Sequence, residues 1–147
     1  MTMKKIEIDT FLKFRFLSNP HFSPDGTKIA FTVSVPDRET NGYLSDLYLY
    51  DLGKKTVSRV TCAGDAKIWS WTAENTLIFT AARTAALKKE KENGTSFFYE
   101  ISPSGGEASC RASVPASVTG IRLLPDGRYL LTIRHDNYKD RSEERRV

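Results

Sequence analysis

The sequence predicts an all-β protein built as an incomplete β-propeller, with about two and a half four-stranded antiparallel blades after a short N-terminal helix. Three observations lead to this fold class. One turn-and-strand pattern recurs at a period close to 50 residues, glycine and proline turns separate short runs of alternating apolar residues, and the first two repeats each supply four such runs. Four short strands per repeat at this period are typical of propeller blades, which pack face to face around a channel.

The repeat is clearest at two turns, Pro24-Asp25-Gly26 and Pro125-Asp126-Gly127, whose aspartates lie 101 residues apart. Proline presets φ for such a turn, aspartate accepts hydrogen bonds from the nearby backbone, and glycine adopts the positive φ that other residues avoid. Residues 68–79 form the middle copy, with Trp71 at the position of Phe22 and a turn that is one residue shorter. The spacing therefore assigns one blade to each repeat.

The leader is expected to cover residues 1–17. Asp9 or Thr10 is a suitable N-cap for a short helix that follows it. This helix would place Phe11 and Phe14 as an aromatic face on the sheet.

The first blade is predicted for residues 18–65. Its second strand places four apolar side chains on one face: Ile29, Phe31, Val33 and Val35. Residues 36–42 are expected to form a polar loop, residues 46–52 the third strand, and residues 57–62 a more polar fourth strand at the outer edge.

The second blade is predicted for residues 66–116, with Tyr99 at the position of Tyr48. Its third strand is expected at residues 97–102 and its fourth at about residues 107–112. Between its second and third strands, one or two helical turns are expected within a segment that ends at Asn93-Gly94: residues 85–94. The charged run in that segment is interpreted as a solvated face, with a partner site as the less favoured alternative.

The third unit, residues 117–147, is predicted as a partial blade of two strands followed by a charged tail. A propeller needs at least four blades to close its ring, so an open ring of this length leaves strand edges and blade faces unpaired. The exposed faces would include Tyr129, Leu131 and Ile133. We therefore expect the chain to self-associate, through edge pairing or swapped strands.

No catalytic, cofactor-binding or metal site is predicted. A Ser-His-acid triad needs a histidine, and the sequence has two, His21 and His135. His21 lies in a strand just before a turn, where a structural role is favoured over a catalytic one. Cys62 and Cys110 are too few and too far apart for a zinc site, and they are interpreted as ordinary apolar side chains, with a disulfide as the less favoured alternative.

The composition excludes several classes of protein. The net charge is +4, but the basic residues alternate with acids throughout, which argues against a nucleic-acid surface. The N-terminus lacks the apolar run of a signal peptide, and no apolar stretch approaches the roughly 20 residues of a membrane span. A cytoplasmic protein with no membrane and no nucleic-acid partner is expected.

The string Leu-Ser-Asn-Pro-His-Phe-Ser-Pro-Asp-Gly-Thr-Lys-Ile-Ala-Phe at residues 17–31, followed by Ser-Asp-Leu-Tyr-Leu-Tyr-Asp-Leu at residues 45–52 and by Val60-Thr61, resembles a known family. It is similar to the start of the N-terminal propeller of prolyl oligopeptidase family serine peptidases, of the acylaminoacyl-peptidase or dipeptidyl-peptidase type. The Ser-Pro-Asp-Gly hairpin also occurs in TolB-like propellers. The leader and its place at the start of the chain favour the peptidases, and the resemblance covers about residues 3 to 136.

The resemblance implies a non-catalytic propeller that gates access of peptide substrates to an α/β-hydrolase domain lying mostly C-terminal to it. That domain carries the catalytic Ser, Asp and His, and no Gly-x-Ser-x-Gly motif occurs in these 147 residues. In some members an acidic propeller residue binds the substrate's N-terminus; Glu39 matches no such motif and is left unassigned. The alternative is a TolB-like or WD-like propeller fragment that binds a protein partner.

Overall fold

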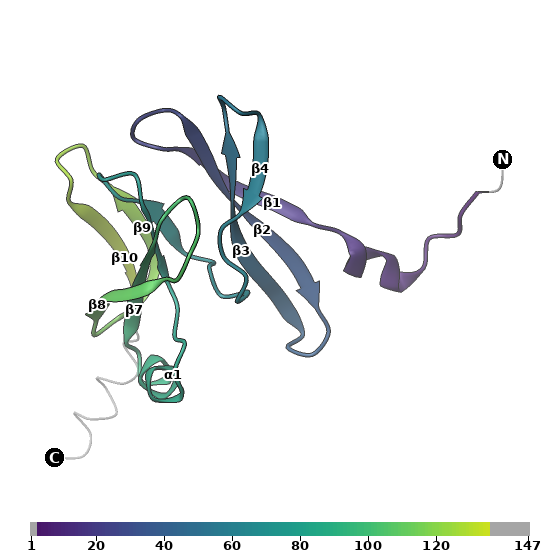
Figure 1. Cartoon of the computed structure of the whole chain (residues 1–147). Coiled ribbons are helices and arrows are strands. Elements are labelled where there is room, and N and C mark those ends of the chain that lie inside the picture. Colours follow the sequence, from purple (N-terminus) through teal and green to yellow (C-terminus); the bar gives the residue numbers. More distant parts are fainter. Residues whose placement is uncertain (1–2, 136–147) are drawn as a thin grey trace, which may run out of the picture.

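The computed structural model describes residues 3–135, which form three antiparallel sheets arranged one after another (Figure 1). In two sheets of four strands and one of two, the strands follow each other in chain order. The predicted fold class is confirmed: the chain is an incomplete β-propeller. The division of the chain at residues 17, 65 and 116 stays a prediction.

The elements occupy the following segments. The first blade contains β1 (Phe16–Phe22), β2 (Lys28–Asp37), β3 (Gly42–Asp51) and β4 (Thr56–Arg59). The second contains β5 (Trp69–Trp71), β6 (Leu77–Thr80), β7 (Ser96–Ile101) and β8 (Ser109–Val114). The third sheet pairs β9 (Ser117–Leu123) with β10 (Tyr129–Arg134), and the helices are η1 (Ile8–Lys13) and α1 (Ala85–Glu92). The tail predicted after His135 lies outside the described residues.

The turns between the first two strands of each blade have the chemistry that the sequence predicts. Gly26 and Gly127 have φ values of +72° and +85°, and Asn75 takes the same place in the second blade with φ 60°. Asparagine tolerates this left-handed conformation better than most residues. The Ser23 N to Lys28 O hydrogen bond of 2.8 Å closes the first turn.

The second turn is one residue shorter, as predicted, because it is closed between Thr72 N and Thr76 O at 2.9 Å. The third turn is equally short, with Leu124 N bonded to Arg128 O at 2.8 Å. The first turn is therefore the exception, although it shares the Pro-Asp-Gly string with the third.

The leader differs from its prediction. η1 is a 3₁₀ helix that begins after Glu7, whose backbone N–H donates to Thr10 Oγ1 at 3.1 Å, so neither Asp9 nor Thr10 is its N-cap. Phe11 and Phe14 are 45% and 51% exposed, so the helix does not bury an aromatic face on the sheet. Its link to the blade is the ion pair between Asp9 and Arg38 in the β2–β3 turn.

Residues 36–42, predicted as a polar loop, instead extend the hairpin. β2 continues to Asp37 and β3 starts at Gly42, because Asp37 Oδ2 closes a tight turn by accepting from Thr40 N at 3.2 Å and from Thr40 Oγ1 at 2.8 Å. The fourth strands also shift slightly from the predicted residues 57–62 and 107–112, and both are mostly exposed, as suits an outer edge.

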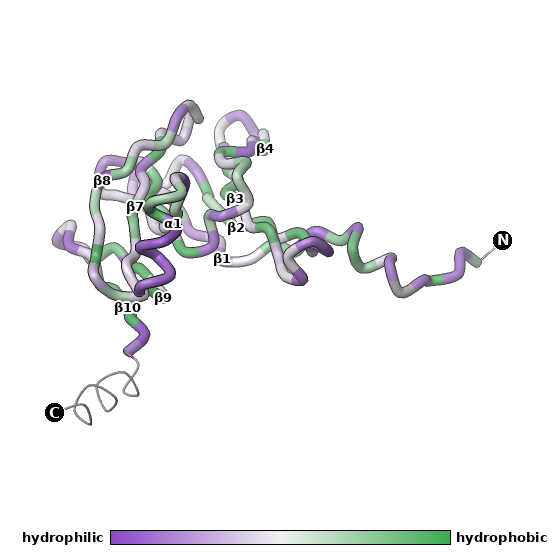
Figure 2. The backbone as a smooth tube through the Cα atoms, turned by 90° about the horizontal axis from the view of Figure 1, so that it is seen from below, coloured by the Kyte–Doolittle hydropathy of each residue, from purple (hydrophilic) through white to green (hydrophobic). Residues whose placement is uncertain are grey.

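The helix α1 confirms the helical turns predicted between the second and third strands. Thr84 Oγ1 accepts from Leu87 N at 3.2 Å, and Gly94 with φ +93° follows the C-cap Asn93. None of its residues is buried, and Figure 2 shows it as a strongly hydrophilic segment. Among the described residues, no helix has the length and apolar character that crossing a membrane requires.

Candidate functional site

The core of the molecule lies in the seam between the first two blades. The second blade presents large side chains to the seam, and the first presents small ones such as Ala30, together with Leu47 and Leu49. Residues of the second blade in this core include Trp69, Trp71, Leu77, Phe79, Tyr99 and Ile101, all no more than 6% exposed. Burial of this many apolar groups is the main force holding the two sheets together.

Hydrogen bonds fix how the second blade sits on the first. Trp69 Nε1 donates to Thr32 Oγ1 at 2.8 Å, and Trp71 Nε1 donates to the carbonyl of His21 at 3.1 Å. At the turns, Asn75 Oδ1 accepts from the backbone of Asp25 at 3.0 Å. Because a hydrogen bond requires a short donor–acceptor distance and a near-linear angle, these contacts favour a single packing of two otherwise apolar faces.

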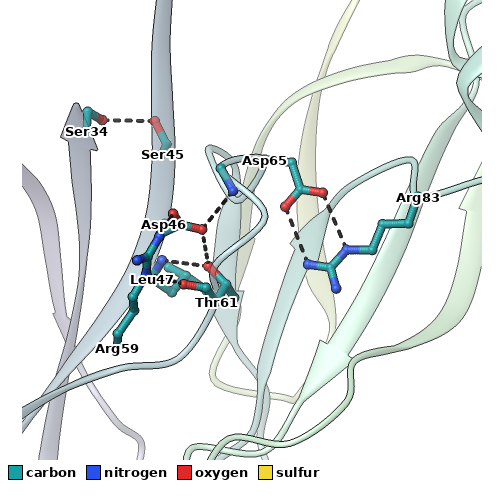
Figure 3. A network of polar contacts seen from close by, with 9 residues as sticks. Ser34, Ser45, Asp46, Leu47, Arg59, Thr61, Asp65 and Arg83 are labelled. Carbon is teal, nitrogen blue, oxygen red and sulfur yellow. Dashed lines mark hydrogen bonds and ion pairs between the residues drawn. The ribbon is translucent and has the colours of Figure 1, made fainter. Parts of the chain in front are cut away.

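A polar node at Asp46 anchors the segment that connects the blades (Figure 3). The buried Asp46 carboxylate accepts from Arg59 at 2.7 Å, from Thr61 Oγ1 at 2.8 Å and from Gly64 N at 3.0 Å. The bond to Asp46 raises the pKa of Arg59. Thr61 Oγ1 in turn accepts from Leu47 N at 3.0 Å, so the chain leaving β4 is held against β3.

Arg83 joins this connecting segment to the second blade. Its guanidinium lies 5.1 Å from the ring centroid of Phe79 and 5.3 Å from that of Tyr99, and its Nε lies 3.4 Å from Asp65 Oδ2. Figure 3 shows Asp65 reaching across from the connecting segment toward Arg83. The two rings restrain the guanidinium by cation–π attraction, which leaves its edge available to carboxylates.

An open cleft of about 740 Å³ lies beside this pair, between the connecting segment and α1. It is lined by Ala63, Asp65, Ala82, Arg83, Lys88, Lys91 and Glu92. Three cations against two acids give it the chemistry to receive a carboxylate. The sequence interpretation treated Lys88 and Lys91 as part of a solvated charge run, and both are exposed.

A second groove, of about 820 Å³, runs over the innermost strands of all three blades. His21 from β1, Ser70 from β5 and Arg122 from β9 line it at equivalent positions of the repeat. The His21 ring makes a 2.8 Å hydrogen bond to Asn19 Oδ1 and an edge-to-face contact with Trp69 at 5.8 Å. In a closed ring this side of the blades faces the channel.

The other residues considered from sequence lie apart from these places. His135 follows β10 and is exposed, and Glu39 is exposed in the β2–β3 turn. Cys62 and Cys110, interpreted from the sequence as ordinary apolar side chains, are free thiols and both are exposed. Within residues 3–135, no three His, Cys, Asp or Glu side chains gather as metal ligands would.

Sequence reasoning missed Asp46 and Arg83. Both sit at the end of an apolar pattern, and each acts through partners distant in sequence: Thr61 and Gly64 for Asp46, Phe79 and Tyr99 for Arg83. A signal was present at Asp46, because it lies opposite the buried Val33 on the side of β3 that also carries Tyr48, where a carboxylate needs partners.

Comparisons with known proteins point to peptidases. No protein-family model matches the chain. The chain is 28% identical over 133 residues to the uncharacterized peptidase YuxL of Bacillus subtilis strain 168, a match that covers 88% of this chain and 19% of that protein. The chain thus spans about a fifth of the length of this relative.

Two solved structures share the fold. The acylaminoacyl peptidase of Pyrococcus horikoshii matches 88% of this chain and 19% of its own, with a TM-score of 0.62 and 18% identity. The β-propeller domain of the Trilobed protease from Pyrococcus furiosus matches 83% of this chain and 35% of its own, with a TM-score of 0.57 and 16% identity. The predicted resemblance to the propeller region of such peptidases is confirmed.

Proposed function

We propose that this chain is the non-catalytic propeller portion of a longer serine peptidase of the prolyl oligopeptidase family, and that it gates the access of peptides to an α/β-hydrolase domain. The observation that carries the proposal is the blade-on-blade arrangement itself, which the chain shares along most of its length with an acylaminoacyl peptidase. The match to a peptidase in sequence supports the same family.

The groove over the innermost strands gives this function a physical basis. It presents the His21 ring and the Arg122 side chain, with Ser70 between them, on the side that faces the channel of a closed ring. A passage lined by bulky and charged groups admits extended peptides more easily than folded chains. Size selection then follows from the shape of the scaffold, and no chemical step is required of this chain.

The gene sequence downstream of Val147 tests the family. An α/β-hydrolase segment with Gly-x-Ser-x-Gly supports the proposal, and a stop codon after further blades favours a protein-binding propeller instead. Hydrolysis of acyl-peptide and dipeptide chromogenic substrates is a second test. We expect none above buffer from the purified 147-residue chain, and clear turnover from the longer protein.

Gating is tested in that longer protein with Arg122→Trp, which narrows the groove. We expect kcat/KM to fall several-fold more for peptides of about ten residues than for dipeptide substrates, because only the longer peptides fill the passage. Arg111→Trp on the edge strand β8 is the matched control, since its side chain is 62% exposed away from the groove. Equal effects of both substitutions on both substrates contradict gating through this groove.

A further inference from the structure

The first blade has one large apolar face that no other part of the described chain covers. We call this set of six residues the outer face: Phe22, Ile29, Phe31, Tyr48, Tyr50 and Val57. The strand register places them together, since Phe22 is opposite Ile29, Ile29 is opposite Tyr50, and Tyr50 is opposite Val57. Their neighbours Ala30, Leu47 and Leu49 point the other way, into the seam with the second blade.

The second blade shows what these positions look like when a neighbouring sheet lies on them. Five residues of that blade occupy the same register positions and are 0–6% exposed: Trp71, Leu77, Phe79, Tyr99 and Ile101. In the outer face, by contrast, Phe22 is 64% exposed and Val57 60%, and the other four residues are only partly buried. The outer face therefore has the composition of a buried interface, and within residues 3–135 no sheet covers it.

The charges on this face do not oppose its burial. Arg59 and Asp46 lie on the same side of the sheet as the outer face and form a 2.7 Å ion pair. The Asp46 side chain is already largely buried, with only 8% of its surface exposed. The Arg59 guanidinium lies 6.0 Å from the centre of the Tyr48 ring. A second sheet can cover this face without leaving either charge unpaired, which is the usual obstacle to burying an ionised side chain.

We propose that the outer face binds the outer face of a second copy of this chain, so that two first blades form a two-fold symmetric sandwich. Sheets pack face to face at a separation of about 10 Å, and two-fold interfaces between identical patches are the commonest kind in homo-oligomers. Unlike the seam within the chain, where large side chains of the second blade meet smaller ones of the first, this contact joins two large faces. Its test on the 147-residue chain does not depend on the proposed peptidase role. In a longer protein, a further blade of the same chain would compete for this face.

The free face of the third sheet is the less suitable partner. It carries Arg122, Thr132 and Arg134, which share one side of the sheet with Leu130. Docking the outer face there would desolvate two arginines against aromatic rings without any carboxylate among these residues to pair them. The same contact would also be head-to-tail, and copies would add to one another until a ring closed.

Sedimentation equilibrium of the purified 147-residue chain over the micromolar range tests the proposal. We expect the average mass to rise from 16.6 kDa to twice that value and to stop there. Phe22→Glu and Val57→Glu each place two like charges within the symmetric contact, and we expect each to raise the dissociation constant at least about tenfold. Phe11→Glu on η1 is the matched control, because Phe11 is 45% exposed outside the outer face, and we expect wild-type dimerisation.

Leu130→Glu separates the two geometries. We expect this variant to form the symmetric dimer as the wild type does. If the contact were instead head-to-tail, Leu130→Glu would abolish it, and the wild-type chain would associate beyond a dimer. Association that survives both Phe22→Glu and Val57→Glu would instead show edge pairing, and a wild-type monomer throughout the range overturns the proposal. Far-UV circular dichroism of each variant confirms that it is folded, which the exposure of Phe22 and Val57 leads us to expect.

Discussion

The indole of Trp69 donates a 2.8 Å hydrogen bond to the hydroxyl of Thr32 across the seam between the first two blades. The two residues are 3% and 4% exposed and lie 37 positions apart in the sequence. A polar contact this deep in an apolar interface adds little net energy, but leaving either partner unpaired is costly. It therefore penalises any sliding of the second blade on the first.

Trp69→Phe tests this contact. The substitution removes the donor and leaves the Thr32 hydroxyl unpaired, so we expect the free energy of unfolding to fall by about 2 to 4 kcal/mol, from lost packing and the lost bond. Thr32→Val leaves the indole N–H unpaired and should cost about 1 to 3 kcal/mol. Urea unfolding of both variants and of the double variant measures the coupling; strictly additive losses would contradict the bond.

The packing of the seam is tested by two equivalent phenylalanines. Phe79 is fully buried in the second blade, and Phe31 holds the same register position in the first, where it is only partly buried. We expect Phe79→Ala to cost about 3 to 5 kcal/mol, a large part of the stability of a domain of this size. Phe31→Ala should cost less than half as much in urea unfolding of the dilute chain. Equal losses would mean that the first blade's outer face is already covered.

The regular features of this fold were predictable because they are local. The Pro-Asp-Gly turns follow from the φ preferences of Gly26 and Gly127, and the match of Phe22 with Trp71 follows from a period that every blade obeys. The exposed state of Phe22 was not predictable from that match. It depends on whether a neighbouring sheet is present, and the repeat pattern is the same in both cases.

The candidate site was harder to predict because its contacts depend on tertiary structure. The cap at Glu7 uses no residue of the usual N-cap set. At residues 36–42, the hairpin depends on the pairing of Asp37 with Gly42 and on the Asp37 to Thr40 bonds, which the sequence pattern does not reveal. Arg83 gains its role from two strands that meet through sheet pairing, Phe79 on β6 with Tyr99 on β7. Single-sequence reasoning finds such a residue only after the register is known.

Arg83 and Asp65 provide a test of which of two contacts matters. Their 3.4 Å separation and their half-buried side chains make the ion pair weak, so Asp65→Asn should cost no more than about 0.5 kcal/mol. Arg83→Lys removes the flat guanidinium from two rings and should cost about 1 kcal/mol more. Thermal unfolding at low and high salt distinguishes them, because the ion pair is the more strongly screened contact. A larger loss from Asp65→Asn would contradict this order.

The two cysteines offer a direct test of their exposure. Cys62 and Cys110 are both free and exposed, so we expect both thiols to react with Ellman's reagent in the folded chain without denaturant. Cys62→Ser and Cys110→Ser should each halve the amount of thionitrobenzoate released from the reagent. One thiol that reacts only after urea is added would show that its side chain is covered, either within the chain or by a second copy.

The first turn predicts how stability depends on pH. Asp25 Oδ1 accepts from Ser23 Oγ at 2.6 Å, from Thr27 N at 3.0 Å and from Thr27 Oγ1 at 2.8 Å. Chiefly through the Ser23 bond, these donors lower the pKa of Asp25 from 3.8 to about 2. Since the folded chain favours the charged form, the carboxylate stabilises the fold fully above about pH 4, and this contribution is lost as the pH falls to 2 and below.

Asp25→Ala should therefore lower the urea midpoint at neutral pH, and its difference from the wild type should shrink steadily between pH 4 and pH 2. Asp25→Asn is the matched control, because its amide keeps the shape and one acceptor oxygen but does not titrate in this range. It should lie between the wild type and Asp25→Ala at neutral pH, with a gap to the wild type that narrows in acid. A difference that stays constant down to pH 2 would mean that the carboxylate charge contributes nothing to this turn, and that the hydrogen-bond geometry alone holds the first hairpin.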